Sequence, residues 1–166
     1  MSKSPFTPFI VLIISLLFLN GCTGNVYKVT SPSMEAALPL DSYITVVPVS
    51  LSALQRGDII MYEQRYSEGQ SHAKRLIGLP GETIDIRENA IYIDGAVLDE
   101  SYPVEPFRSF QIHEPITLAD DEYYVLGDNR PNSSDSRRIG PISGDEIVGK
   151  VVITRWNRFL NALESE

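Results

Sequence analysis

Two kinds of hydrophobic pattern divide this chain of 166 residues near residue 24. Residues 9–19 are apolar at every position except Ser15. Beyond residue 25 the apolar positions form short β-branched and aromatic runs, some of them alternating with polar residues and bounded by Gly, Pro or Asp. Runs of this kind predict strands joined by turns. We therefore expect a hydrophobic leader or anchor helix over residues 1–24 and a single, mostly β domain over residues 25–166.

Seven runs have the composition of strands. They cover residues 43–49, 58–62, 83–87, 90–94, 96–98, 122–126 and 147–156. Asp94-Gly95 is a hairpin signal between two of these runs, and Gly57 permits a tight turn between two others. Such closely spaced runs predict an antiparallel sheet.

The stretches between the runs predict connections. Residues 101–117 contain three prolines, which cannot donate to a sheet ladder, so this stretch is expected to be an extended connection. Residues 127–144 are too polar for a strand and predict a loop. The last ten residues, 157–166, are expected to form a short surface helix.

The leader is shorter than a typical membrane span. Its apolar run has 11 residues, whereas a bilayer-spanning helix needs about 20. Leu19-Asn20-Gly21-Cys22 resembles a lipobox, in which a small residue precedes a cysteine that is lipidated after cleavage. Either Cys22 carries a lipid or the uncleaved segment is a plain anchor with a chance thiol, and the two alternatives stay open. Both place residues 25–166 at a membrane surface outside the cytoplasm.

Composition excludes several classes of protein. The chain has 22 acidic and 14 basic residues, and a net charge of -8 opposes binding to nucleic acid. A single cysteine rules out an internal disulfide, and two histidines, His72 and His113, fall short of a zinc site. We expect neither a metal nor another cofactor.

The first of three polar clusters is Thr30-Ser31-Pro32-Ser33-Met34. Pro32 restricts Ser31 to extended backbone and fixes its own φ, which stiffens the placement of Ser33. In an extended chain one hydroxyl could act as a nucleophile while the other donates a hydrogen bond beside it. Taken alone, the cluster is also consistent with an ordinary structural loop.

The second cluster surrounds Lys74, one of only four lysines. A lysine at the edge of a β core is commonly a solvated charge with a packed stem. Burial would instead disfavour the charged form, and a neutral amine could then act as a general base for a serine. The sequence leaves both interpretations open.

The third cluster, residues 127–137, mixes two acids, two arginines and three serines. It could be a solvated turn or a buried polar network that holds the loop in one shape. In the second case Asp135 could pair with Arg137, and a serine hydroxyl could orient the lysine amine.

Together these clusters resemble the bacterial type I signal peptidase family. The matching motifs occur in the family's order: Ser31-Pro-Ser33-Met34, Arg56-Gly57-Asp58-Ile-Ile, Lys74-Arg75-Leu-Ile-Gly78-Leu-Pro80-Gly81-Glu82, and Gly127-Asp128-Asn129-Arg130 through Arg137. The resemblance covers residues 28–157. It implies a coiled antiparallel β fold and a Ser-Lys dyad that cleaves secretory signal peptides after a small residue.

The resemblance also implies a role for individual residues. Ser33 would be the nucleophile and Lys74 the general base, while the Ser31 hydroxyl and the Ser33 N–H would form the oxyanion hole. The remaining roles are a hydrogen bond from Ser133 to the lysine amine, a brace formed by Asp135 and Arg137, and a place beside the substrate cleft for Met34. The partners implied are the signal peptides of preproteins and membrane lipid, with the enzyme acting as a monomer.

Two short stretches depart from the family pattern. Ala36-Ala37 replaces the usual Pro-Thr, and Asp41-Ser42 replaces the usual Gly-Asp, which puts the turn after the nucleophile in doubt. The domain is also small for the family, which keeps a specialised maturation peptidase, for example one acting on a pilin, as an alternative. A non-catalytic, lipoprotein-like binding module is the other alternative.

Overall fold

The computed structural model describes residues 24–64, 70–106, 114–153, 157 and 162. The expected leader, Cys22 and His113 lie outside these residues, as does most of the expected C-terminal helix. Among the described residues, no helix is both long and apolar enough to cross a membrane.

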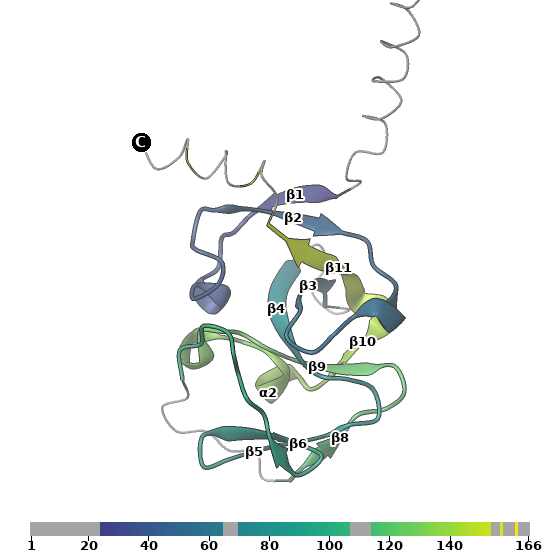
Figure 1. The fold of residues 1–166 in the computed structure, drawn as a ribbon. Coiled ribbons are helices and arrows are strands. Elements are labelled where there is room, and N and C mark those ends of the chain that lie inside the picture. Colours follow the sequence, from purple (N-terminus) through teal and green to yellow (C-terminus); the bar gives the residue numbers. More distant parts are fainter. Residues whose placement is uncertain (1–23, 65–69, 107–113, 154–156, 158–161, 163–166) are drawn as a thin grey trace, which may run out of the picture.

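A seven-stranded antiparallel sheet makes up most of the fold (Figure 1). Its strands, in spatial order, are β1 (Asn25–Lys28), β2 (Tyr43–Val47), β11 (Ile147–Val152), β3 (Ile59–Glu63), β4 (Ser71–Gly78), β9 (Glu122–Leu126) and β10 (Ile142–Ser143). Strands that are distant in sequence are therefore neighbours in space, and β11 lies between β2 and β3.

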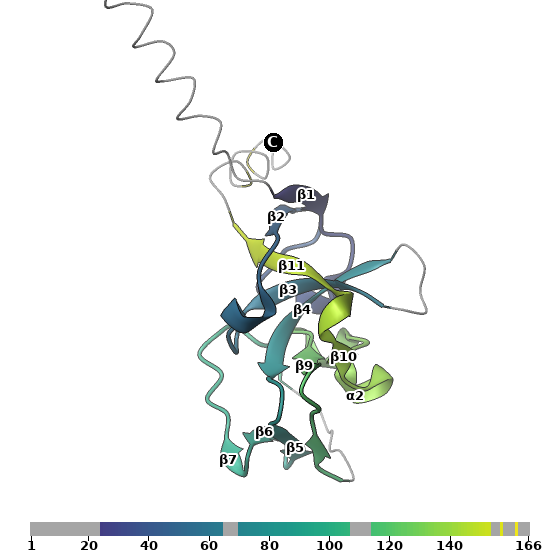
Figure 2. The ribbon, with the colours of Figure 1, turned by 90° about the vertical axis from the view of Figure 1, so that its right-hand side faces the viewer.

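A second, four-stranded sheet lies at one end of the molecule, at the bottom of Figures 1 and 2. Its strands, in spatial order, are β7 (Ala96–Val97), β6 (Ala90–Ile93), β5 (Thr83–Arg87) and β8 (Ile116–Thr117). Asp94 and Gly95 both have positive φ, 51° and 82°, at the hairpin between β6 and β7. The Asp-Gly hairpin prediction is confirmed.

The predicted strands are present, with small changes at their ends. The run expected over residues 43–49 ends at Val47, because Pro48 follows and cannot donate to the ladder. The last strand ends at Val152 rather than at 156. The mostly β, antiparallel fold class is confirmed.

Several elements were not predicted as such. The stretch that contains Lys74 is a central strand, β4, and two-residue strands lie within the expected connections, β8 in 101–117 and β10 in 127–144. A short helix, α2 (Ser136–Ile139), also interrupts the expected loop over 127–144. Asp135 caps this helix by accepting a hydrogen bond from the Arg137 N–H, a local contact that hydropathy does not reveal.

Three clusters of buried side chains hold the sheets together. One lies between β4, β9 and the four-stranded sheet, one lies behind the turn that carries Ser33, and one packs around β3 and β9. Their central members are Ile77, Ile84, Tyr124 and Leu126; Met34, Leu38, Ile44 and Met61; and Ile60, Tyr62, Leu76 and Val125. Strand β4 contributes to the first and third clusters, so the strand that carries Lys74 is fixed from more than one side.

Candidate active site

Ser33 and Lys74, 41 residues apart in the sequence, meet in the folded protein. Ser33 lies in a 3₁₀ turn over Pro32–Met34, and Lys74 lies in β4. The Lys74 Nζ donates a hydrogen bond to the Ser33 Oγ at 2.7 Å and a second one to the carbonyl oxygen of Ala73 at 3.2 Å. A serine hydroxyl and a potential base are thus in direct contact.

The Lys74 amine is buried without an ion-pair partner among the described residues. Its residue is only 3% exposed, and Ser33 is 6% exposed. Burial lowers the pKa of Lys74 from 10.5 to about 8, although Asp135 and Asp128 favour the charged form from a distance. The solvated-lysine interpretation is therefore wrong, and burial raises the share of neutral amine near neutral pH.

Ser31 lies beside Ser33 as the sequence predicts. Its backbone is extended, with φ −122° and ψ 137°, in agreement with the restriction that Pro32 imposes. The Ser33 N–H donates to the Ser31 Oγ over a long distance of 3.4 Å, and Asn129 N–H donates to the Ser33 carbonyl oxygen at 3.0 Å. The Ser33 N–H and the Ser31 hydroxyl therefore lie side by side, where both could contact one substrate oxygen.

The loop after β9 packs tightly against the nucleophile turn. A Cβ atom at Gly127 would lie 2.6 Å from the Ser33 carbonyl oxygen, so only glycine permits this approach. The Asp135 carboxylate accepts hydrogen bonds from the Gly127 N–H at 2.9 Å and from two nitrogens of the Arg137 guanidinium at 2.7 Å each. The predicted pairing of Asp135 with Arg137 is present. Through its contact with the Gly127 N–H, Asp135 also holds the part of the loop that packs against Ser33.

Ser133 does not make the hydrogen bond that we expected. Its Oγ is buried and has no hydrogen-bond partner among the described residues, and it occupies the space that a Cβ atom at Gly127 would need. Ser133 and Lys74 do border the same pocket. The resemblance predicted the neighbourhood of Ser133 but not its contact.

Comparison with known proteins identifies the family of this chain. The family model for signal peptidase, peptidase S26, matches residues 4–156. The chain belongs to this family.

Several curated relatives carry matching names. The chain is 31% identical over 163 residues to probable signal peptidase I-1 of Synechocystis, covering 89% of this chain and 82% of that protein. It is 30% identical over 135 residues to probable signal peptidase I-2 of the same organism, covering 77% and 61%, and 34% identical over 137 residues to signal peptidase I of Leptolyngbya laminosa, covering 77% and 66%. The chain thus spans less than two thirds of the length of two of these relatives.

A solved structure is also similar in sequence. It is a crystal structure of a signal peptidase I from Enterococcus faecalis, which is 36% identical and covers 63% of this chain and all of that chain, with a TM-score of 0.49. Membership of the signal peptidase family rests on the family model and on the curated relatives.

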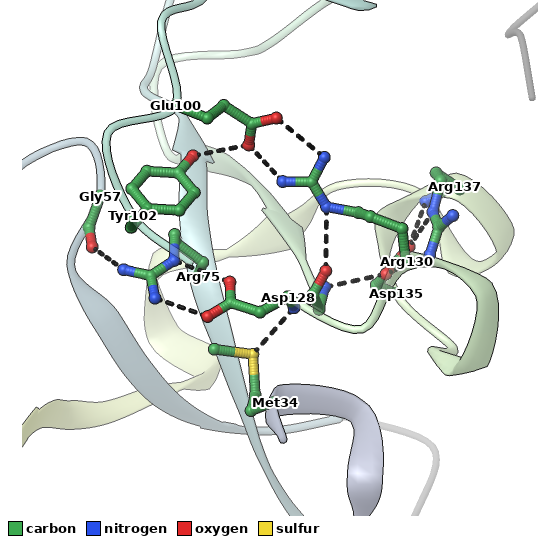
Figure 3. A network of polar contacts seen from close by, with 10 residues as sticks. Met34, Gly57, Arg75, Glu100, Tyr102, Asp128, Arg130, Asp135 and Arg137 are labelled. Atoms are coloured by element: carbon green, nitrogen blue, oxygen red, sulfur yellow. Dashed lines mark hydrogen bonds and ion pairs between the residues drawn. The ribbon is translucent and has the colours of Figure 1, made fainter. Parts of the chain in front are cut away.

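Met34, the residue after Ser33, is buried at the cleft. It is 1% exposed and borders the pocket beside the dyad. Its Sδ accepts a hydrogen bond from the Asp128 N–H at 3.4 Å (Figure 3). Met34 therefore ties the nucleophile turn to the loop after β9, in addition to its predicted place beside the cleft.

A network of charged residues lies on the other side of β4 (Figure 3). Its members Arg75 and Asp128 lie in the matching sequence motifs, but no role was predicted for them. The Arg75 guanidinium forms a two-pronged ion pair with Asp128, with nitrogen-to-oxygen distances of 2.7 and 2.5 Å, and donates to the Gly57 carbonyl oxygen at 2.7 Å. It also lies 4.0 Å from the ring centre of Tyr102. This network anchors β4 at Arg75, the residue after Lys74.

The network continues through Glu100. The Tyr102 hydroxyl donates to Glu100 at 2.8 Å, and the Arg130 guanidinium pairs with the same carboxylate and donates to the Gly127 carbonyl oxygen at 3.0 Å. Alternation along a strand could have predicted that Arg75 points away from Lys74 and needs a counter-charge. Nothing in the sequence marks Glu100 or Tyr102, which lie at the start of the proline-rich connection, Glu100 one residue before it.

Two pockets meet at the dyad. The smaller, of about 70 Å³, has an apolar wall formed by residues such as Val29, Met34 and Ala73. The larger, of about 400 Å³, is bordered mainly by polar residues. Both pockets include Ser31, Ser33, His72 and Lys74, so the dyad stands between them.

His72 forms part of both pocket walls without joining the dyad. Its ring packs at a tilt on Tyr62, with the ring centres 5.5 Å apart. Burial, followed by the nearby charge of Lys74, lowers the pKa of His72. The described hydrogen bonds of Ser33 and Lys74 do not include His72. His72 therefore lines both pockets and takes no direct part in the Ser33–Lys74 contact.

The side chains that commonly bind metals are dispersed among the described residues. Within residues 24–64, 70–106 and 114–153, His, Asp and Glu side chains nowhere gather in a group of three or more that could hold a metal ion. The chemistry that the site can perform is that of a serine nucleophile with a lysine base.

Proposed function

We propose that this chain is a membrane-associated serine endopeptidase that removes signal peptides from exported preproteins by cleavage after a small residue. The observation that carries the proposal is the 2.7 Å contact between the Lys74 Nζ and the Ser33 Oγ, with the amine buried and its pKa lowered to about 8. A neutral lysine at this distance can accept the hydroxyl proton, which makes the serine a competent nucleophile.

In the first half of the reaction, the Ser33 Oγ attacks the carbonyl carbon of the scissile bond while its proton passes to the Lys74 Nζ. The carbonyl oxygen becomes an oxyanion, which the Ser33 N–H and the Ser31 hydroxyl stabilise. The Ser33 N–H exchanges its long hydrogen bond to Ser31 for one to this oxyanion. Collapse of the intermediate breaks the C–N bond, and the Lys74 ammonium gives its proton to the leaving amine.

In the second half, the ester between Ser33 and the substrate acyl group is hydrolysed. Water loses a proton to the neutral Lys74 amine and attacks the ester carbonyl. The second intermediate collapses with cleavage of the ester bond, and the proton returns from Lys74 to the Ser33 Oγ. One lysine therefore serves as base and acid in both halves.

The smaller pocket suits the residue before the scissile bond. A volume of about 70 Å³ with an apolar wall accepts a small side chain and excludes a large one. Strand β9 pairs with β4 only from Arg75 onward, so residues 71–73 keep one edge without a paired strand among the described residues. An extended substrate segment could add to this edge beside the dyad.

We further propose that the leader attaches the enzyme to the membrane, with the catalytic domain on the outer side and each monomer carrying a complete dyad. In this proposal cleavage removes residues 1–21, and the lipid on Cys22 is then the anchor. Mass spectrometry of the membrane-extracted protein tests it, because lipidation requires a new terminus at Cys22 and a matching mass increase. An intact Met1 and a free Cys22 thiol would show that the uncleaved segment is the anchor.

The two alternatives receive no support from the comparisons. The relatives are named signal peptidase I rather than maturation peptidases of one substrate. A binding module would have no need to bury a lysine against a serine hydroxyl at a cost in stability.

Incubation of the full-length chain in detergent with synthetic signal-peptide substrates tests the proposed activity. Mass spectrometry should find one cut after a small residue, and Ser33→Ala should abolish it. Absence of cleavage in all substrates, or equal cleavage by Ser33→Ala, would contradict the proposal.

A further inference from the structure

The larger pocket has a lining unlike that of the smaller one. It is bordered by hydroxyl, amide and cationic side chains, including Gln64, Asn132, Ser134 and Arg138. Its volume of about 400 Å³ can hold more than one side chain. The dyad separates the larger pocket from the small apolar pocket. A peptide that places the small residue before the scissile bond in the small pocket therefore leads the residues after that bond into the larger pocket.

The larger pocket is bordered by basic side chains and by no described acidic residue. Its described lining includes Lys74, His72 and Arg138 but no carboxylate. This is unexpected in a chain with a net charge of -8. The Arg138 side chain is exposed on α2, and no described residue pairs with its guanidinium.

Arg138 is the lasting charge of the three. Lys74 must be neutral to act as a base, and the lowered pKa of His72 keeps its ring neutral at the same pH. A guanidinium stays protonated at any usable pH. The pocket therefore presents one fixed cation with hydrogen-bonding amides nearby.

We propose that this pocket selects substrates with an acidic side chain at the first or second position after the scissile bond, through Arg138. The inference rests on the proposed function, because that function decides which pocket receives the leaving part of the peptide. It adds a preference on the product side of the cut to the requirement for a small residue before it.

Matched peptides test the selection. They differ only in carrying Asp, Asn or Lys at the first or second position after the cleavage site, and the full-length chain in detergent cleaves them. We expect kcat/KM to be about fivefold higher for Asp than for Lys at one of the two positions at low ionic strength, and the ratio to shrink at high salt. Arg138→Glu should invert the ratio, and Arg138→Gln should bring it close to one.

Arg87→Glu is the matched control. Arg87 is exposed on β5 in the four-stranded sheet, and its replacement changes the net charge by the same amount. The Asp-to-Lys ratio should stay at its wild-type value in this variant. A ratio that is unchanged in Arg138→Glu, or changed equally by Arg87→Glu, would overturn the proposal.

Binding separates a failure of this inference from a failure of the proposed function. If no peptide is cleaved, the proposed activity is wrong, but fluorescence anisotropy can still compare the affinities of labelled Asp and Lys peptides. Tighter binding of the Asp peptide that reverses in Arg138→Glu would support the acidic selection. Equal affinities in the wild type would overturn it.

Discussion

Two neighbouring cations on β4, Lys74 and Arg75, are both buried and have opposite surroundings. Lys74 is 3% exposed and contacts a serine hydroxyl and a backbone carbonyl. Arg75 is 6% exposed and is paired with Asp128, a carboxylate with no exposed surface. Because successive residues of a strand point to opposite faces, one strand separates the two environments.

The difference shows how a fold assigns roles to buried charges. The two-pronged pairing with Asp128 makes the Arg75 side chain a brace between strand and loop. Lys74 lacks such a partner among the described residues, so burial favours its neutral form, which is the form a general base needs. Arg75 therefore braces the structure, and Lys74 is left in the state that the proposed chemistry requires.

Removal of either member of the dyad should have the largest effect. Ser33→Ala should lower kcat by about 10⁴-fold or more, because no acyl-enzyme can form. Lys74→Arg should be as inactive, because arginine stays protonated. Steady-state cleavage measures both variants, and circular dichroism checks that they are folded. Near-normal cleavage by Lys74→Arg would mean that residue 74 acts as a fixed charge.

Breaking the brace should mainly affect stability. Asp128→Asn leaves Arg75 buried without its counter-charge, so we expect the free energy of unfolding to fall by about 3 kcal/mol in urea titrations. Asp41→Asn is the control. It removes the carboxylate of the exposed pair with Lys28 and should change the free energy of unfolding by less than about 1 kcal/mol. Equal losses in the two variants would contradict a special role for the buried pair.

The pH dependence of activity and of stability should reveal the lowered pKa of Lys74. With the pKa of Lys74 near 8, kcat/KM should rise as the pH passes through about 8 and then level off. The unfolded chain binds a proton on this lysine up to about pH 10.5, whereas the folded chain has already lost it. Relative to Lys74→Met, wild-type stability should therefore increase between about pH 8 and 10.5, by up to about 3 kcal/mol.

Two measurements check that prediction. A pH-rate profile gives the apparent pKa of the base, and urea titrations of the two proteins across the same pH range give the difference in stability. A rising limb near pH 10.5, or a stability difference that does not change with pH, would show that Lys74 is solvated or paired in solution.

Ser133→Ala should have the smallest effect. Its buried hydroxyl has no hydrogen-bond partner among the described residues, so its removal should leave the free energy of unfolding within about 0.5 kcal/mol of the wild-type value. If Ser133 orients the lysine amine only when substrate is bound, kcat should fall by up to about tenfold while stability is unchanged. A loss of kcat as large as that of Lys74→Arg would instead mean that the reaction requires the Ser133 hydroxyl.

Local patterns were sufficient for much of the fold. Strands β5 and β9 have the bounds that period-two and β-branched runs predict, and Asp94-Gly95 marks its hairpin. Strand β4 escaped this approach because it lies between β3 and β9 and is buried on both faces from Lys74 to Gly78, so its apolar positions do not alternate. A central strand that carries two adjacent cations looks like a polar segment until its neighbours are known.

By itself, the sequence determined which residues could perform the chemistry and the stiff turn at Pro32 that carries the nucleophile. Only the tertiary structure decided the state of each candidate: that Lys74 is buried against Ser33, that Arg75 is paired with Asp128, and that the Ser133 hydroxyl lacks its expected partner. The reason is physical. The protonation state of a side chain depends on the solvent and charges around it, and those come from strands far away in the sequence.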